Sequence, residues 1–142
     1  MAEEVVKLHY TVKADDFSIA GEASSDVKKV LKNLGFSPDI IRKVAVAMYE
    51  CEINMVIHAD GGVIDVEITP EKIRMVHTDK GPGISDIEKA MQEGYSTADE
   101  QAREMGFGAG MGLPNMQRYT DEMKITSIIG VGTTVDMSVF VS

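Results

Sequence analysis

The sequence has a single cysteine, Cys51, among its 142 residues. One cysteine excludes a disulfide within the chain and a zinc site built from several cysteines. Because Cys51 stands among the apolar residues of an expected helix, we expect a buried thiol rather than a reactive one.

Long apolar runs and a secretory signal are also lacking. No run approaches the ~18–20 apolar residues that a membrane span needs. The N-terminus lacks a basic segment followed by an apolar one, the pattern of a secretory signal. We therefore expect a cytoplasmic protein that makes no membrane contact.

Basic residues are scarce. Lys and Arg number 14 against 23 Asp and Glu, and the formal net charge is −9. This balance argues against a nucleic-acid partner. If so acidic a chain binds a polyphosphate, backbone dipoles and a divalent cation must offset the repulsion.

The apolar content is sufficient for a folded core. The hydrophobic share is 44%, with no low-complexity tract and no internal repeat. A chain of this size and composition predicts one domain, spanning residues 1–142.

Glycine recurs at every second position over residues 106–112, at Gly106, Gly108, Gly110 and Gly112. Such a stretch can take positive φ angles and turn its backbone N–H groups toward one face. Residues 111–119 predict a helix, whose first unpaired N–H groups would add to that face. The pattern is typical of a phosphate cradle, and a flexible loop without a ligand is the alternative on these residues alone.

Apolar periodicity predicts the other elements. In chain order they are a strand at 5–12, helices at 18–34 and 39–59, a hairpin of strands at 63–69 and 73–78, a polar lid at about 85–105, the helix at 111–119, and strands at 122–129 and 133–141. Ser37 and Pro38 should begin the second helix as N-cap and first helical residue. Ser24 and Ser25 of the first helix are expected to face water.

The short turns between these strands imply a mixed, mostly antiparallel sheet covered on one face by helices. The predicted fold class is therefore an α/β two-layer sandwich.

Polar residues recur along the helix at 39–59. Glu50, Asn54 and His58 are spaced four residues apart and form one line on its surface. A carboxylate and an amide one turn apart could supply a proton acceptor and the oxygen ligand that Mg²⁺ prefers. A solvated helix face is the alternative.

Asp79 ends a predicted strand directly before the loop of Gly81 and Gly83. Its carboxylate could point into a cleft and accept a hydrogen bond from an exocyclic amine. Alternatively it could cap the N–H groups of its own loop.

Three of these motifs together resemble the GHKL ATPase superfamily, whose members have the Bergerat or histidine-kinase-like ATPase fold. Glu50-x-x-x-Asn54 with His58 is similar to its N-box, and Asp79-x-Gly81-x-Gly83 to its G1 box. The alternating glycines at 106–112, followed by Leu113, resemble its G2 box. The small size is closest to the anti-sigma regulatory factor serine/threonine-protein kinases.

The resemblance implies ATP and Mg²⁺ as cofactors. Asn54 would coordinate Mg²⁺, and Glu50 would be the general base. Asp79, with Gly81 and Gly83, would bind the adenine, and Thr133 would complete its pocket, with Thr134 as the alternative to Thr133. The phosphates would rest on the G2 residues Gly106, Gly108, Gly110, Gly112 and Leu113.

The resemblance also implies a partner, because these kinases phosphorylate a serine or threonine of an anti-sigma antagonist with a STAS domain. It leaves open a direct contact with a sigma factor and a homodimer. A nucleotide-dependent module that sequesters a sigma factor or similar regulator without efficient transfer is the alternative function. A dinucleotide-binding oxidoreductase fits poorly, because its glycines should follow a first strand near the N-terminus.

Some positions depart from the simplest family pattern. Cys51 and Glu52 are bulkier or more polar than expected beside Glu50, and the lid is longer than a minimal kinase requires. No basic residue is an evident partner for the γ-phosphate. Arg103 in the lid and Lys80 in the G1 loop are candidates, and a solvated loop residue is the alternative for Lys80.

Overall fold

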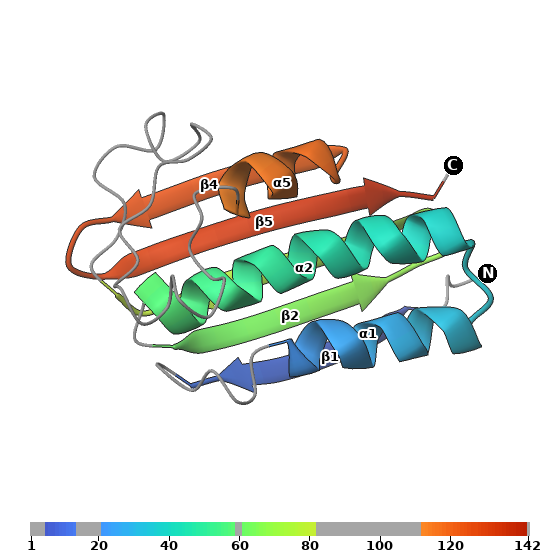
Figure 1. Cartoon of the computed structure of the whole chain (residues 1–142), viewed down its shortest axis with the longest axis horizontal. Coiled ribbons are helices and arrows are strands. Elements are labelled where there is room, and N and C mark those ends of the chain that lie inside the picture. The colour runs from blue at the N-terminus through green and yellow to red at the C-terminus, as the bar shows by residue number, and fades with distance from the viewer. Residues whose placement is uncertain (1–4, 14–20, 59–60, 82–111, 142) are drawn as a thin grey trace, which may run out of the picture.

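The computed structural model describes residues 5–13, 21–58, 61–81 and 112–141, apart from the side chains of 57, 58, 112 and 113. Its elements in chain order are β1 (Val6–Val12), α1 (Glu22–Asn33), α2 (Pro38–His58), β2 (Gly62–Ile68), β3 (Lys72–Asp79), α5 (Gly112–Arg118), β4 (Glu122–Ile128) and β5 (Gly132–Phe140). The described helices α1, α2 and α5 lie on one face of the sheet, as Figure 1 shows. The predicted two-layer sandwich is confirmed, and the predicted lid at 85–105 lies outside the described residues.

The strands form one sheet in the order β1-β2-β3-β5-β4. Each of the four pairings between described strands is antiparallel. The sheet is therefore antiparallel throughout its described part. Strand β3 lies at its centre and carries Asp79 at its end.

The core lies between this sheet and the helices. Helix α2 contributes Val44, Ala47, Met48, Cys51 and Met55, all buried. The sheet contributes alternate residues of its strands, namely Ile64, Val66, Ile68, Ile73, Met75, Val135, Met137 and Val139. The opposite face of the sheet carries polar pairs instead, as expected for an antiparallel sheet with one face in water. There His9 Nδ1 lies 2.6 Å from Asp65 Oδ1.

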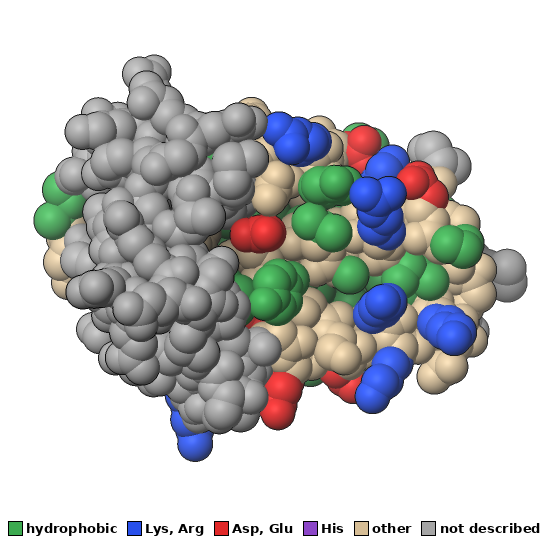
Figure 2. Space-filling view, viewed as in Figure 1, with side chains coloured by type: hydrophobic (Ala, Val, Ile, Leu, Met, Phe, Trp, Pro, Cys, Tyr) green, Lys and Arg blue, Asp and Glu red, His purple; other side chains and the backbone are tan. Residues whose placement is uncertain are grey.

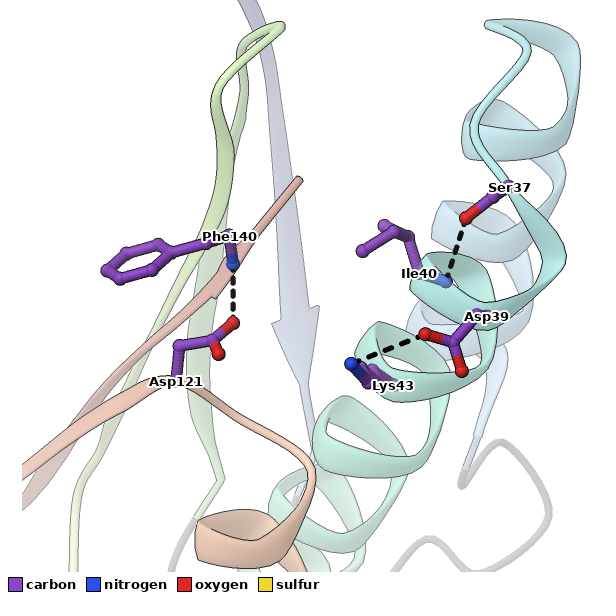
Figure 3. Close-up of polar contacts among 6 residues, drawn as sticks. All are labelled: Ser37, Asp39, Ile40, Lys43, Asp121 and Phe140. Carbon is purple, nitrogen blue, oxygen red and sulfur yellow. Dashed lines mark hydrogen bonds and ion pairs between the residues drawn. The ribbon is translucent and has the colours of Figure 1, made fainter. Parts of the chain in front are cut away.

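Local capping fixes the ends of α2 and β5, as Figure 3 shows. Ser37 Oγ accepts a hydrogen bond from the N–H of Ile40 at 3.3 Å, which confirms the predicted N-cap. Asp121, directly before β4, accepts a hydrogen bond from the N–H of Phe140 through Oδ2 at 2.6 Å. These two hydrogen bonds therefore stabilise the start of α2 and the end of β5.

Helix α1 differs from its prediction in two respects. It begins at Glu22, and Gly21 before it has a left-handed backbone with φ +95°, so the helix does not extend back from there. The expectation that Ser24 faces water was wrong, because Ser24 is buried. Its N–H and hydroxyl are both used within the fold, the hydroxyl donating to the carbonyl of Gly21 at 3.0 Å.

No helix in the described part of the chain is long and apolar enough to cross a membrane. Figure 2 shows several Lys and Arg side chains on the helix-covered face. Lys28 and Lys29 of α1 and Arg42 of α2 are exposed. The net charge of −9 therefore does not describe the electrostatic field over this face.

Candidate functional site

The predicted site residues that the structure describes gather at one end of the molecule. Figure 1 shows that α2 ends and β5 begins at this end, and that the first residues of α5 lie on the same side of the molecule. The end of β3 lies beside the start of β5. Chain direction explains this, because antiparallel neighbours such as β3 and β5 end and begin at the same edge. Segments more than 70 residues apart in the sequence, such as α2 and β5, thereby contribute to one region.

Asp79 is held by the neighbouring strand. Its Oδ1 accepts a hydrogen bond from the N–H of Thr133 on β5 at 2.9 Å. Burial raises the pKa of Asp79, and the N–H of Thr133 acts in the opposite direction by stabilising the charged form. Among the described residues, Asp79 Oδ2 has no hydrogen-bond partner. Within this part of the chain the carboxylate therefore keeps one acceptor oxygen, which the cleft interpretation requires.

Glycines stand on both sides of Asp79 in the sheet. A Cβ atom on Gly62 of β2 would lie 2.7 Å from Asp79 Cα, and one on Gly132 of β5 would lie 2.1 Å from the Asp79 carbonyl oxygen. Gly132 also has φ +150°, which side chains rarely adopt. A side chain at either glycine would push the strands apart, so both positions beside Asp79 require glycine.

Thr133 and Thr134 point to opposite faces of the sheet. Thr133 is buried on the side of Asp79, and its Oγ1 lies 2.9 Å from Ser127 Oγ. Thr134 pairs in register with Thr78 and Thr126 on the other face. Thr133 is therefore the member of the pair that shares a face with Asp79. Its contact with a nucleotide stays a prediction.

Helix α2 lies against this part of the sheet. The Met55 methyl lies 2.8 Å from the position of a Cβ on Gly62. Burial raises the pKa of the Cys51 thiol well above its ordinary value, and the charges of Asp79 and Glu52 add to the effect. The prediction of a buried thiol is confirmed, and the inner side of α2 is placed beside Asp79.

Glu50 and Asn54 are half-buried on α2, so neither lies on a fully solvated face. No hydrogen bond within the described residues uses the Asn54 side chain. Glu50 Oε1 accepts one from Asn115 Nδ2 of α5 at 3.4 Å. His58 is the last residue of α2, and its side chain lies outside the description.

The G1 and G2 motifs are only partly described. The N–H of Gly81 donates to the carbonyl of Val131 at 3.3 Å, which ties the start of the G1 loop to the β4–β5 turn. The N–H of Lys80 donates to the carbonyl of Gly61, and its side chain is exposed. Gly112 and Leu113 begin α5. The remaining predicted residues, Gly83, Arg103, Gly106, Gly108 and Gly110, lie outside the described ranges.

Sequence reasoning did not assign two side chains that the structure places in this region. Glu52 is buried and its carboxylate accepts the N–H groups of Gly21, Ala23 and Ser24 at the start of α1. Glu52 follows the apolar residue Met48 by four positions, so both lie on the same side of the helix. An acid on the apolar side of a helix is a sequence signal that its carboxylate is buried. Asn115 had no such signal, because its partner Glu50 is 65 residues away.

Comparison with known proteins adds to this geometry. Residues 13–139 match the model of the histidine kinase-like ATPase domain. The chain belongs to the histidine kinase-like ATPase family. The resemblance carried by the three motifs is confirmed by this match.

Two relatives of the ATPase family illustrate its range. The chain is 32% identical to the serine/threonine-protein kinase RsbT of Bacillus subtilis over 112 residues, which is 76% of this chain and 78% of that kinase. It is 37% identical to an anti-sigma F factor of Caldanaerobacter subterraneus over 106 residues, 71% of each chain.

A solved structure shows the same fold. It contains the RsbU and RsbW domains of a Mycobacterium tuberculosis protein, with a TM-score of 0.65 and 18% identity. The match covers 94% of this chain and 32% of the longer one.

Proposed function

We propose that this protein is a Mg²⁺-dependent serine/threonine-protein kinase. It transfers the γ-phosphoryl group of ATP to a hydroxyl of a small STAS-domain partner. The observation that carries the proposal is the half-buried carboxylate of Glu50, which stands one helical turn before Asn54. It directly precedes Cys51, whose thiol is close enough to Asp79 to feel its charge. The similarity to a bacterial serine/threonine-protein kinase supports the same activity.

The nucleotide base fits the surroundings of Asp79. Its Oδ2 can accept a hydrogen bond from the exocyclic amine of adenine, while the N–H of Thr133 holds Oδ1 at 2.9 Å. The bare backbone at Gly62 and Gly132 lets the strands close tightly around this carboxylate. A raised pKa at Asp79 is consistent with a partly dry pocket, in which one hydrogen bond discriminates strongly between bases.

Glu50 supplies the chemistry on the protein side. Its carboxylate accepts the proton of the attacking serine or threonine hydroxyl as the new O–P bond forms and ADP departs. Phosphoryl transfer otherwise requires positioning more than covalent chemistry, so one base can suffice.

Asn54 fits a magnesium ligand. The described residues hold no cluster of three or more His, Cys, Asp or Glu side chains, so a cation there would take its other ligands from water and phosphate, which Mg²⁺ favours. When bound, Mg²⁺ supplies charge neutralisation between the phosphates. The glycines of 106–112 remain the predicted phosphate cradle.

The test is transfer of labelled phosphate from ATP to a panel of purified STAS-domain proteins. We expect the wild type to label one of them, and Glu50→Gln to lower the rate by roughly 100-fold or more while retaining ATP affinity. Phosphate transfer by Glu50→Gln at the wild-type rate would refute the assignment of Glu50 as the general base. If the wild type binds ATP but labels no member of the panel, the binding-module alternative takes precedence, as the similarity to anti-sigma factors allows.

A further inference from the structure

A side chain of α5 reaches the proposed base across the helix interface. Asn115 Nδ2 donates to Glu50 Oε1 at 3.4 Å, and both residues are half-buried. The two helices pack against each other at this point, so the contact is not a chance meeting of long surface side chains.

A second contact fixes which way the amide of Asn115 faces. Arg118, three residues on along α5, donates from Nη1 to Asn115 Oδ1 at 3.4 Å. A guanidinium group can only donate and a carboxylate can only accept. The amide therefore has one consistent orientation, with its oxygen toward Arg118 and its NH₂ group toward Glu50.

We propose that Asn115 is a positioning residue for the base, an inference that rests on the proposed kinase function. Its amide limits the rotation of the Glu50 carboxylate and keeps one oxygen engaged, so that the other faces the incoming hydroxyl. Asn115 is neutral, and the cation of Arg118 stands one residue farther away. Among the described residues no cation pairs with the Glu50 carboxylate, so the amide orients it there without an ion pair that would weaken it as a proton acceptor.

The length of the contact suits this role. At 3.4 Å it is longer than the usual N–H···O hydrogen bond of about 2.7–3.2 Å. Hydrogen bonds of catalytic groups often reach their full alignment only in the reacting complex. Loss of the contact should therefore appear in the rate of transfer and leave nucleotide binding unaffected.

The experiment compares four variants with the wild type, using the STAS-domain protein that accepts most phosphate from it. Asn115→Asp keeps the shape but replaces the donor with a second carboxylate. Asn115→Gln keeps the donor on a longer side chain. Gln117→Ala, at an exposed position of the same helix, is the matched control, and Glu50→Gln reports on the base itself. Rates, KM for the partner, ATP affinity and melting temperature are measured for each.

We expect Asn115→Asp to lower kcat by roughly 10- to 100-fold, with ATP affinity and KM for the partner unchanged. Asn115→Gln should recover part of the rate, and Gln117→Ala should match the wild type. A merely structural role would instead lower the melting temperature of Asn115→Asp and leave kcat of the folded protein intact.

The outcomes separate the two proposals. If Glu50→Gln is inactive but Asn115→Asp transfers phosphate at the wild-type rate, the positioning role is overturned and the kinase function stands. If Glu50→Gln is fully active, or the wild type transfers no phosphate to any partner, both are overturned.

Discussion

At the scale of single residues, His77 is the least expected feature of the core. It lies two residues before the end of β3, in register with Ile64 and Val135, and is 1% exposed. Neither ring nitrogen has a hydrogen-bond partner within the described structure. Burial lowers its pKa to about 3. The ring is therefore buried in its neutral form among apolar side chains. Its two unpaired nitrogens lower the stability of the fold.

This gives a prediction for the pH dependence of stability. The unfolded chain takes up a proton at His77 near its ordinary pKa of 6.5, and the folded chain does so only near about 3. Stability should fall as the pH drops below 6.5, by up to about 1.4 kcal/mol per pH unit from this residue. His77→Leu should remove that contribution and add about 1 kcal/mol or more at pH 7, because no unpartnered nitrogen remains.

Urea unfolding at pH 7 and pH 5 measures both effects. His9→Gln is the control, since His9 is exposed on the outer face of the sheet. The interpretation is wrong if wild type and His77→Leu lose the same free energy of unfolding between the two pH values.

At the scale of elements, the start of α1 depends on a residue of α2. Gly21 provides no side-chain cap. The carboxylate of Glu52 takes that place and accepts the N–H groups of Gly21 at 2.8 Å, Ser24 at 3.1 Å and Ala23 at 3.3 Å. An acid at a helix N-terminus also interacts favourably with the helix dipole. Helices α1 and α2 are thus joined by a buried polar contact as well as by apolar packing.

We predict that Glu52→Ala lowers the free energy of unfolding by about 2–4 kcal/mol, because it leaves several buried N–H groups without an acceptor. Glu22→Ala is the matched control. Glu22 is likewise an acid near the start of α1, in its first turn, but its side chain is exposed. Denaturant unfolding gives both values. Equal and small losses in the two variants would show that Glu52 does not cap the helix.

The elements were largely predictable from the sequence, and the links between them were not. Ser37 with Pro38 located the start of α2 to within one residue, because an N-cap acts within one turn. The same local reasoning placed Ser24 in water, because the acceptor of its N–H group comes from Glu52, 28 residues away. Spacing within one element is visible in the sequence, and contacts between elements depend on how they pack.

The residues of the candidate site likewise fall into those that local sequence predicts and those that depend on packing between elements. Glu50 and Asn54 stand out because one helix sets their spacing, and Asp79 because a loop follows it. The choice between Thr133 and Thr134 required the register of β3 against β5, and a slip of one residue would have reversed it. Asn115 required the packing of α5 on α2.

At the scale of the whole molecule, the proposed ATP site connects segments from across the chain. It takes Asn54 from α2, Asp79 from β3 and Thr133 from β5. A ligand that contacts all three binds only the folded protein, so it should raise stability in proportion to the logarithm of its concentration. Binding and global unfolding are therefore coupled.

We predict that ATP with Mg²⁺, at roughly 100 times its dissociation constant, stabilises the wild type by about 2.7 kcal/mol. ATP with a chelator should stabilise it less. In Asn54→Ala the difference between the two conditions should vanish, because the proposed oxygen ligand for the cation is gone. Asn33→Ala is the control, as Asn33 is exposed at the end of α1. Thermal unfolding and calorimetry measure the effect, and a Mg²⁺-dependent shift in Asn54→Ala equal to that of the wild type would exclude Asn54 as the ligand.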